Sequence, residues 1–448
     1  MNMGIAPVFV QGNSRIFIGV ITIMPTIIVL GTLDTKGIEY RYICDVLETL
    51  QLDPVVVDIS CFDNAHQYAA DYSCNKLAEL SGADYKQIRE KDRKGAAELI
   101  LKGAKTAVSE IYSGAADGII ALGGANGTFM ACEVMKTLPL GFPKVMISVV
   151  PAGDPRENVG TDDIVLFNTI TDTYLNAILK TVINNACAGL LGMIEHSGYL
   201  SGAVDENRES VCISMLGLVQ KCLDNMRYKL EDNNWELQVF HANGMGGRAM
   251  EKIISTRQVD GVIELAINEL LNNIVGGVFD AGENRMDAAI RGGKPMVIVP
   301  GCIDFINFWG QNIPEKYKDR TFIYHTAQNT LMRTNVEESA GLGEILAEKL
   351  SRVETGTAVL IPDRGVSGND AADGSMGINQ GQKVKWYDPE ANKAFSNSLE
   401  SNITNDLVKI EVLDSHINDK TFALEVLKEF SSLTEGRIDG ECATDKSG

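Results

Sequence analysis

The sequence predicts an α/β protein with two Rossmann-like, doubly wound domains, whose sheets are mainly parallel and which a long helix joins. Its 448 residues are enough for two or three domains, each with its own core. Short apolar, β-branched runs alternate with segments of helical period, as in buried parallel strands and their crossover helices. The second half repeats phrases of the first, since D-G-V-I-E-L at 260–265 matches D-G-I-I-A-L at 117–122 and K-P-M-V-I-V-P-G at 294–301 matches P-K-V-M-I-S-V-V-P-A-G at 143–153. Chance sharing of such phrases among α/β proteins is the alternative.

The first domain is expected over residues 25–200. We predict strands at Thr26–Leu30, Pro54–Ile59, 117–122 and within 143–154, and helices at Ile38–Leu50, 94–112, 129–138 and 164–195. The polar segment 61–95 reads as an insertion that forms a lid or an edge. The helix at 164–195 carries Ile170, Tyr174 and Ile178 on one side, so we expect it to join the domains or to form a dimer contact.

The second domain is expected over residues 201–430. It begins with a strand at Val211–Leu218, a helix at Val219–Leu230 and a strand at Leu237–His241. Residues 367–385 are rich in Gly, Ser, Asn and Asp and predict a loop. Residues 1–24 are interpreted as an extension, with Met24 as a candidate natural start, and residues 431–448 as a disordered tail.

Composition narrows the class of partner. The formal net charge of −20 argues against nucleic acid as a bulk electrostatic partner, although a local basic pocket for a nucleotide stays possible. Nine scattered cysteines without a C-x-x-C pair suggest reduced thiols and a cytoplasmic location. Five histidines without H-E-x-x-H spacing make a zinc site improbable. The apolar stretch Ile16–Leu30 lacks a cleavage site and is interrupted by Pro25, so no exported or membrane-bound form is expected.

The stretch Asp117–Thr128, D-G-I-I-A-L-G-G-A-N-G-T, is the most informative in the chain. A buried strand delivers the chain to paired glycines and then to a helix, where backbone N–H groups and the helix N-terminus suit an anion. We interpret the loop as half of a binding site. A tight strand-to-helix turn without a ligand is the alternative.

Further Gly-rich loops lie at other strand ends, where open α/β sheets bind their ligands. They are 31–37, 151–154, 241–248 and 300–304. In the first of them, Lys36 suits a phosphate, Thr35 can donate from its hydroxyl, and Asp34 can hold Mg²⁺ directly or through water. The alternative makes Asp34 or Thr35 a helix N-cap and Lys36 a solvated charge.

No Walker A motif is present, so a nucleotide would not be held in a P-loop. Gly244, Gly246 and Ala249 fit G-x-G-x-x-A after a predicted strand, with Glu264 at the end of the next strand. This weak dinucleotide fingerprint gives NAD binding a small weight, because it follows the second strand of its half rather than the first.

Candidates for catalysis are His241, Asp304 and Arg333. His241 suits an acid, a base or a donor, Asp304 follows another strand end, and Arg333 suits a carboxylate or phosphate. A satisfied histidine and a structural ion pair are the alternatives. Arg364 and His416 are further polar points whose place relative to a cleft the sequence does not give. Because G-x-S-x-G is absent and no cysteine lies in an electropositive setting, the sequence supports a binding site better than a reaction.

Nine motifs in order give the chain a resemblance over residues 26–430. They are G-T-L-D-T-K-G at 31–37, L-G-G-A-N-G-T at 122–128, L-P-L-G-F-P-K-V-M-I-S at 138–148, V-G-T-D-D-I at 159–164, F-H-A-N-G-M-G-G-R-A-M-E at 240–251, P-G-C-I-D-F-I-N-F at 300–308, L-M-R-T at 331–334, R-G-V-S at 364–367 and H-I-N-D at 416–419. The chain resembles a largely uncharacterised family of bacteria, fungi and plants that includes the ATP-binding N-terminal domain of a tomato protein inhibiting tobamovirus replication.

The resemblance implies two Rossmann-like domains, ATP or ADP with Mg²⁺, and a homodimer. It supplies no reaction. The plant protein continues into a barrel domain, a role that a separate barrel-type chain would take here. Two segments depart from the family's pattern: Gly123–Thr128 replaces G-G-S-G-G-T, and Ser148–Asp154 replaces S-T-V-A-S-G-D, so that three hydroxyls able to bind phosphate are lost.

The sequence therefore predicts a cytosolic ATP-binding protein. An enzyme acting on a small phosphorylated or carboxylated metabolite, or a protein-interaction module, is the alternative. The expected nucleotide-binding residues are Gly31, Thr32, Asp34, Thr35, Lys36, Gly123, Gly124, Asn126, Gly127, Thr128, Gly153 and Asp154, with Asp34 at the magnesium ion. The expected second-domain cleft consists of His241, Gly244, Gly246, Gly247, Arg248, Glu264 and Asp304.

Overall fold

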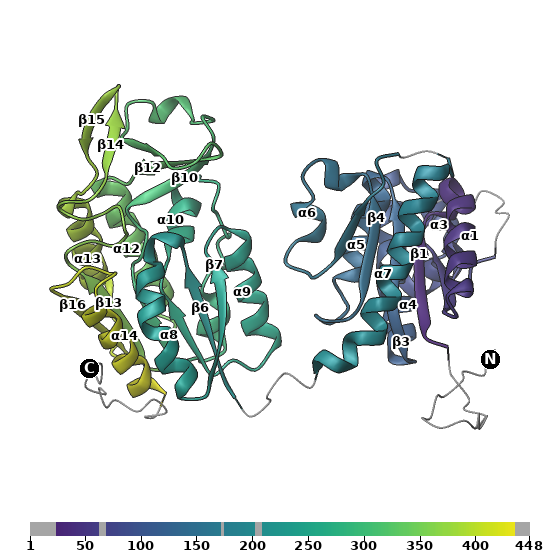
Figure 1. Ribbon diagram of the computed structural model, residues 1–448, viewed down its shortest axis with the longest axis horizontal. Coiled ribbons are helices and arrows are strands. Elements are labelled where there is room, and N and C mark those ends of the chain that lie inside the picture. Colours follow the sequence, from purple (N-terminus) through teal and green to yellow (C-terminus); the bar gives the residue numbers. More distant parts are fainter. Residues whose placement is uncertain (1–23, 62–68, 172–173, 202–207, 435–448) are drawn as a thin grey trace, which may run out of the picture. The chain divides into compact units, whose positions relative to one another are not determined.

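The chain forms two compact units, Met1–Asp205 and Glu206–Gly448. A computed structural model describes residues 24–61, 69–171, 174–201 and 208–434 (Figure 1). Most of the extension predicted over 1–24 and most of the tail predicted over 431–448 lie outside these residues. The last helix, α14 (Lys420–Leu433), runs into the predicted tail, so the first residues of that segment are helical rather than disordered.

The first unit contains one parallel sheet in the order β2-β1-β3-β4-β5. The strands are β1 (Thr26–Gly31), β2 (Asp53–Asp58), β3 (Ala116–Gly123), β4 (Lys144–Ser148) and β5 (Val165–Asn168). Between β1 and β5 the chain forms α1 (Leu33–Thr49), α2 (Cys74–Ser81), α3 (Tyr85–Arg89), α4 (Arg93–Ser113), α5 (Ala125–Met135), a 3₁₀ turn η1 (Val150–Ala152) and α6 (Arg156–Val159). β1 is buried on both faces, as its β-branched run predicts.

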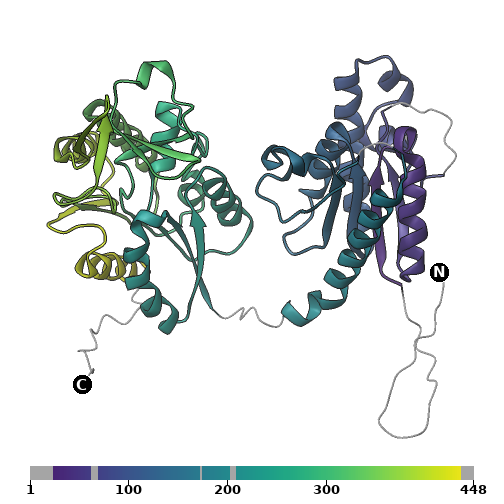
Figure 2. The same cartoon turned by 45° about the horizontal axis from the view of Figure 1, so that its top comes forward.

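Helices cover both faces of this sheet. Residues of α1 and α7 (Ala177–Ser201) pack on one face with Ile27 and Val29, and residues of α2, α4 and α5 pack on the other with Ile28 and Leu30. Figure 2 shows α7 lying beside α1, with which it is in contact. The first unit is thus a doubly wound sheet, and the two faces alternate along β1 as the pleat requires.

The helix predicted at 164–195 is wrong in its first part. Val165–Asn168 forms the edge strand β5, and helix α7 begins only at Ala177. Ile170 and Tyr174 have positive φ and lie before the helix, so they share no helical face with Ile178. Residues 164–195 are apolar, as in a buried helix, and the sequence alone does not show where the helix begins. The four residues Val165–Asn168 pair with β4, and this pairing makes them a strand.

Helix α7 is the last helix of the first unit. Ala177–His196 is long and apolar enough to cross a membrane, alone among the helices of the described ranges. Leu179, Ile183, Cys187 and Leu190 are nevertheless buried in the core of the first unit.

The second unit repeats the strand pattern of the first in a larger parallel sheet, β16-β13-β9-β8-β6-β7. Its strands are β6 (Glu209–Met215), β7 (Trp235–His241), β8 (Gly261–Glu264), β9 (Met296–Ile298), β13 (Thr357–Pro362) and β16 (Val408–Leu413). The first strand lies between the second and the third, as in the first unit. The repeated phrases at 117–122 and 260–265 therefore occupy equivalent strands, β3 and β8.

Helices again cover both faces of the parallel sheet. One face carries α8 (Gln220–Asp232), which follows a 3₁₀ turn η2 (Gly217–Val219), together with α14. The other carries α9 (Met245–Thr256), α10 (Asn268–Val275), α11 (Asp287–Arg291), α12 (Val336–Leu350) and α13 (Pro389–Asn402).

A second, antiparallel sheet in this unit was not predicted. It has the order β10-β12-β11-β14-β15 and consists of β10 (Phe305–Trp309), β11 (Phe322–Tyr324), β12 (Asn329–Arg333), β14 (Met376–Asn379) and β15 (Gln382–Lys385), with a 3₁₀ turn η3 (Glu315–Tyr317). The loop predicted at 367–385 is thus partly wrong, because its second half is a hairpin. Gln380 and Gly381 both have positive φ there, as a two-residue hairpin turn requires.

The hydroxyl of Tyr40 joins the ends of β1 and β3. It donates to Leu30 O at 2.8 Å, accepts from Leu122 N at 2.9 Å and lies against Leu122 O. The last paired residues of the two strands are Leu30 and Ala121, so the hydroxyl takes over where the strand pairing stops.

We expect Tyr40→Phe to destabilise the first unit by about 1–3 kcal/mol, because it leaves the buried Leu122 N–H without an acceptor. Urea denaturation of the full chain measures this change. Tyr42→Phe on the same helix is the matched control, since its hydroxyl bonds the exposed Asn184 and its loss should cost under about 1 kcal/mol. Equal losses in the two variants would contradict the role given to Tyr40.

Candidate functional site

The first unit has a crevice where its strand order reverses. The helix after β1 covers one face of the sheet and the helix after β3 covers the other, so the ends of these neighbouring strands diverge. Ligands of doubly wound proteins bind at such switch points, beyond the carboxyl ends of the strands. The topology therefore singles out the loops after β1 and β3.

A pocket of about 800 Å³ lies at this crevice. Four groups of residues line it: Thr32, Asp34, Thr35 and Lys36 after β1; Gly124, Ala125, Asn126, Gly127, Phe129 and Met130 after β3; Arg93, Lys94, Ala97, Glu98 and Leu101 on α4; and Ile59 and Cys61 after β2. The two loops that the sequence analysis placed first thus line one pocket. We call it the switch-point pocket.

The loop after β1 is held by side chains at the end of β2. Asp58 accepts from Leu33 N at 3.2 Å, and Ser60 accepts from Asp34 N at 3.1 Å. Thr32 occupies the N-cap position of α1 but its side chain makes no capping bond, so neither residue proposed as the N-cap serves as one. The first amides of α1 are thus already bonded, and the Thr35 hydroxyl lies 3.1 Å from the Thr32 hydroxyl. Thr32, Asp34, Thr35 and Lys36 are the side chains of this loop that line the pocket.

The loop after β3 leaves its amides free. Gly124 is the N-cap of α5 and provides no side-chain bond, and Thr128 N bonds Gly124 O. The N–H groups of Ala125, Asn126 and Gly127 make no hydrogen bond within the described part of the chain. Three unpaired amides at the positive end of a helix dipole are an arrangement that favours an anion.

Charge in the pocket is opposite to that of the chain. Among the described lining residues, Lys36, Arg93 and Lys94 contribute three positive charges, while Asp34 and Glu98 contribute two negative ones. The net excess is positive in a protein of net charge −20. Arg93 and Lys94 come from the first turn of α4 and were not among the predicted site residues, because the sequence does not show which face of that helix turns toward the loops.

The setting of Cys61 favours its protonated thiol. Burial, followed by the charge of Asp34, raises the pKa of its thiol, and the nearby Arg93 opposes this only in part. The thiol is therefore protonated at neutral pH, and the thiolate is the reactive form.

Several predicted nucleotide-binding residues have structural roles instead. A Cβ on Gly31 would collide with the Tyr40 ring, and one on Gly123 would lie 2.8 Å from Thr128 N. Thr128 is buried and bonds Gly123 O and the Ser148 hydroxyl. These three residues shape the loops without lining the pocket.

The loop at 148–154 does not reach the pocket lining. Gly153 and Asp154 belong to the turn after β4, and the exposed Asp154 pairs with Arg156, which lowers the pKa of the Asp154 carboxyl to about 2. Its departure from the family's pattern therefore lies outside the switch-point pocket.

The Gly-rich loop of the second unit already holds an internal anion. Glu269 accepts from Gly244 N at 2.7 Å and from Gly247 N at 3.0 Å, while Asn243 accepts from Gly246 N. Glu269 is fully buried. Because its carboxylate occupies the amides that would bind a phosphate, the dinucleotide fingerprint is not a ligand site.

Glu264, the acidic residue of that fingerprint, is also part of an internal ion pair. Glu264 is buried and makes a bidentate ion pair with Arg285, at 2.7 and 2.6 Å. Arg285 also pairs with Glu269 and Glu251, and these charges raise its pKa further although burial opposes them. Glu264 is thus buried and paired inside the unit, and the NAD interpretation is not supported by its position.

The predicted catalytic candidates do not form one site. Asp304 and Arg333 lie together and are buried. The guanidinium of Arg333 donates to the Asp370 carboxylate and to the backbone carbonyl oxygens of Asp304, Trp386 and Asp388. His241 is exposed at the end of the edge strand β7. Asp304 lies in the loop after β9, which is three strands away from β7 in the sheet.

The remaining polar points are also structural. Arg364 pairs with Asp414, and the ring of His416 bonds Ser367 O and Asn418 N. Arg248 donates to Ala281 O and Asp280 O. The loops after β13 and β16 meet the loop after β6, since Gly368 N and the Asn418 amide both donate to Leu218 O.

A magnesium ion fits Asp34 in one respect. The Oδ1 atom of Asp34 is buried without a hydrogen-bond partner, which is the state of a carboxylate oxygen that lacks a ligand. Within the described residues no group of three or more His, Cys, Asp or Glu side chains is close enough to hold a metal. Asp34 therefore fits Mg²⁺ that arrives with phosphates, which supply the remaining ligands, rather than a metal bound by protein alone.

Comparison with known proteins matches this chain over nearly all of its described length. The N-terminal domain of the Uncharacterised protein family (UPF0261) matches residues 25–198, and its C-terminal domain matches residues 208–434. The fold and the site thus define a two-unit α/β protein with a crevice in its first unit. The chain belongs to the uncharacterised protein family UPF0261.

Relatives come from bacteria and from a plant. A UPF0261 protein of Clostridium tetani is 35% identical and aligns over 91% of this chain and 99% of its own length. The ToMV resistance protein Tm-1(GCR237) of Solanum lycopersicum is 30% identical over 93% of this chain but only 57% of its own length, and the ToMV susceptible protein tm-1(GCR26) is similar at 29%. The predicted family resemblance is confirmed. This chain spans little more than half of the tomato proteins.

The buried carboxyl of Asp304 is expected to make the stability of the second unit depend on pH. Burial, followed by repulsion from Asp370, raises the pKa of Asp304 to about 6, while Arg333, Trp386 and Ser367 lower it in part. A raised pKa means that folding favours the protonated form, so its contribution to stability is present below about pH 4 and is lost as pH rises through about 6.

We expect Asp304→Asn to become more stable relative to the wild type as pH rises. The difference in the free energy of unfolding should grow by on the order of 2–3 kcal/mol from pH 4 to pH 7.5. Chemical denaturation across this range measures the difference. Asp414→Asn is the control, because the exposed Asp414 has a lowered pKa and should give no such gain. A pH-independent difference between Asp304→Asn and the wild type would show that Asp304 does not titrate in this window.

Proposed function

We propose that this protein binds a nucleotide, ATP or ADP with Mg²⁺, in the switch-point pocket of its first unit. One observation supports this most: the free amides at the start of α5 line the same pocket as Lys36, Arg93 and Lys94. An anion-binding helix end next to three cations is the arrangement that a polyphosphate needs. The second unit supplies no equivalent, because Glu269 occupies its loop.

In this proposal the phosphates lie between the two loops. The amides of Ala125, Asn126 and Gly127 bind one phosphate, and Lys36 approaches from the loop after β1. Arg93 offers a planar donor pair to another phosphate. Magnesium bound with the nucleotide would neutralise part of the phosphate charge, and Asp34 is the residue that would contact the ion.

The apolar side of the pocket suits the base. Ile59, Leu101 and Met130 line it, and Phe129, the fifth residue of α5, is 51% exposed. An exposed aromatic ring beside an anion site provides a stacking surface for a planar base. The pocket volume of about 800 Å³ is in the range of small-molecule sites.

Binding, rather than a defined reaction, is what the pocket supports. Among the described residues that line it there is no histidine, and burial raises the pKa of the Cys61 thiol. The exposed His241 lies in the other unit. A cytoplasmic location, a homodimer, a small-metabolite substrate and a separate barrel-type partner chain remain predictions from the sequence.

Gly127→Asp tests the phosphate site without disturbing the fold. A Cβ at Gly127 meets nothing within 4 Å, and an acidic residue in the first turn of a helix is favourable. We expect unchanged or slightly higher stability, and a loss of Mg-ATP affinity of about 10-fold or more, because the carboxylate takes the place of a phosphate.

Isothermal titration calorimetry with Mg-ATP measures this affinity, and the wild type should bind about one nucleotide per chain. Gly127→Asn is the matched control, because it has the same shape without the charge. Absence of wild-type binding at millimolar Mg-ATP would reject the proposed function.

Phe129→Ala tests the base site separately. Stacking of a base on an aromatic ring contributes about 1–3 kcal/mol, so we expect ATP to bind about 5- to 150-fold more weakly to this variant. Inorganic triphosphate with Mg²⁺ has no base and should bind both proteins equally. If ATP loses nothing in Phe129→Ala, Phe129 is not the stacking surface, and the phosphate site stands by itself.

A further inference from the structure

Two of the walls of the switch-point pocket are helices that run side by side. Helix α4 leads into β3 and α5 follows it, so both run antiparallel to this strand, and their residues pack in one core on the same face of the sheet. Lys105 of α4 pairs with Glu133 of α5 at 3.3 Å. This ion pair fixes which turns of the two helices lie opposite each other.

Counting back from this ion pair gives the levels of the pocket. Four residues earlier, about one helical turn, stand Leu101 on α4 and Phe129 on α5. Seven residues earlier, about two turns, stand Glu98 and Asn126. Residues at these spacings share a helical face, and all four line the pocket. The pocket thus has an apolar level and, one turn nearer to the helix N-termini, a polar level that contains Glu98.

The cations of the pocket lie beyond the polar level. Lys94 is on the same face of α4, one turn before Glu98, and Arg93 adjoins it. The first N–H groups of a helix point toward its N-terminal end, so the free amides of α5 direct a phosphate to this end as well. The successive levels are one turn, about 5.4 Å, apart, and they follow the order of phosphate, ribose and base in a nucleotide.

The carboxylate of Glu98 is the one that the pocket leaves for hydroxyl groups. It has no hydrogen bond or ion pair within the described part of the chain. Asp58, at the end of β2, already accepts from Leu33 N and Ser60 N, and Asp34 lies in the loop with Lys36 at the phosphate end. An ionised carboxylate only accepts hydrogen bonds, and two adjacent hydroxyls of a ribose can both donate to it.

We propose that Glu98 binds the 2′- and 3′-hydroxyls of the ribose, and so makes the switch-point pocket selective for ribonucleotides over nucleotides that lack these hydroxyls. This selectivity rests on the proposed function. A ligand with both hydroxyls satisfies the carboxylate, whereas a ligand without them places its phosphates near a negative charge to which it donates nothing.

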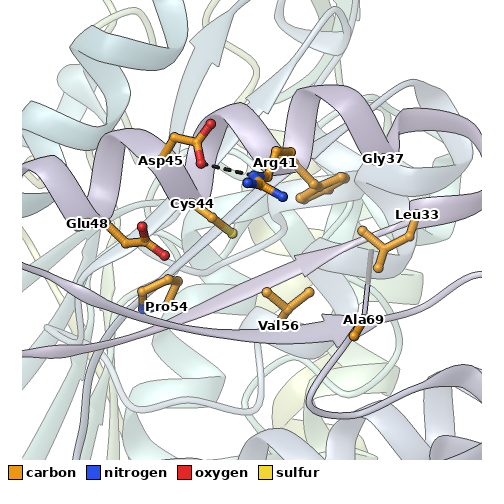
Figure 3. A pocket seen from close by; sticks show the side chains of 10 residues that line it. Leu33, Gly37, Arg41, Cys44, Asp45, Glu48, Pro54, Val56 and Ala69 are labelled. Carbon is orange, nitrogen blue, oxygen red and sulfur yellow. Dashed lines mark hydrogen bonds and ion pairs between the residues drawn. The ribbon is translucent and has the colours of Figure 1, made fainter. Parts of the chain in front are cut away.

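Another cavity of the first unit provides a matched control. It has a volume of about 410 Å³ and runs between α1 and β2 (Figure 3). Figure 3 shows Arg41 and Asp45 paired on α1, with Glu48 further along the same helix. Like Glu98, Glu48 is an exposed helical glutamate that lines a cavity. The described lining of this cavity includes no residue of α5, so it lacks the free amides.

Calorimetric titration of the full chain with Mg-ATP and with Mg-2′,3′-dideoxy-ATP measures the selectivity. We expect the wild type to bind ATP about 10-fold more tightly, and Glu98→Ala to bind the two nucleotides within about 2-fold of each other. Alanine favours the helix, so α4 is kept. Both nucleotides carry the same base and triphosphate, and a general effect of the lost charge therefore cancels in the ratio of their affinities. Glu48→Ala should keep the wild-type ratio.

Inosine triphosphate tests whether Glu98 contacts the base instead. It has the same ribose and triphosphate as ATP but no 6-amino group. We expect Glu98→Ala to leave the ratio of the ATP and inosine triphosphate affinities within about 2-fold of the wild type. A larger change in this ratio would place the carboxylate at the base and overturn its assignment to the ribose.

The outcomes separate ribose recognition from nucleotide binding. If the wild type binds ATP and dideoxy-ATP equally, or if Glu98→Ala keeps the preference for ATP, Glu98 does not bind the ribose, while nucleotide binding stands. A lost preference in Glu48→Ala would move the nucleotide to the cavity between α1 and β2 and reject both. Absence of wild-type binding to either nucleotide rejects the proposed function, and ribose recognition with it.

Discussion

The hydroxyl of Tyr40 is the contact on which the geometry of the first unit depends. It satisfies backbone groups of Leu30 and Leu122 where β1 and β3 cease to pair, and it does so from inside the core. The ring fits only because residue 31 is a glycine, since a Cβ there would lie 1.6 Å from the ring. One helical residue therefore fixes where both strands end, and the loops that line the switch-point pocket start from those two ends. Burial raises the pKa of Tyr40 far above neutral pH, so this contact does not titrate.

The two units show that the same strand order gives different chemistry. In both, the first strand lies between the second and third. In the first unit the amides at the start of α5 are unpaired, whereas in the second the amides of the Gly-rich loop bind Glu269. Glycines in the second loop serve close packing, because a Cβ on Gly246 would lie 1.9 Å from His241 O and one on Gly247 would lie 2.1 Å from the Glu269 carboxylate. A Gly-rich loop after a strand thus indicates close approach of some group, and in the second unit that group is an internal carboxylate.

The sequence predicted the strands β1, β4 and β6, because each is an apolar run that is almost completely buried, and it predicted the loops at Asp34–Lys36 and Gly124–Gly127. It missed the edge strand β5, which is short and not buried. It missed the antiparallel sheet, whose strands of three to five residues have no periodicity long enough to recognise. A signal existed for one part, since Gln380-Gly381 between two short alternating runs is a hairpin turn. Arg93, Lys94 and Phe129 were missed for a different reason. They lie on helices, and only tertiary packing determines which helical face turns toward the loops.

The net negative charge of the chain means that the proposed nucleotide binding must depend on short-range contacts. The chain carries −20 overall, so its long-range field opposes the approach of a polyphosphate, and only contacts inside the pocket favour it. Free amides and the guanidinium of Arg93 act over hydrogen-bond distances and are little affected by that field. A metal that lowers the charge of the ligand reduces the same long-range repulsion. In the proposed function, magnesium therefore acts in two ways, by neutralising the nucleotide before it arrives and by contacting Asp34 afterwards.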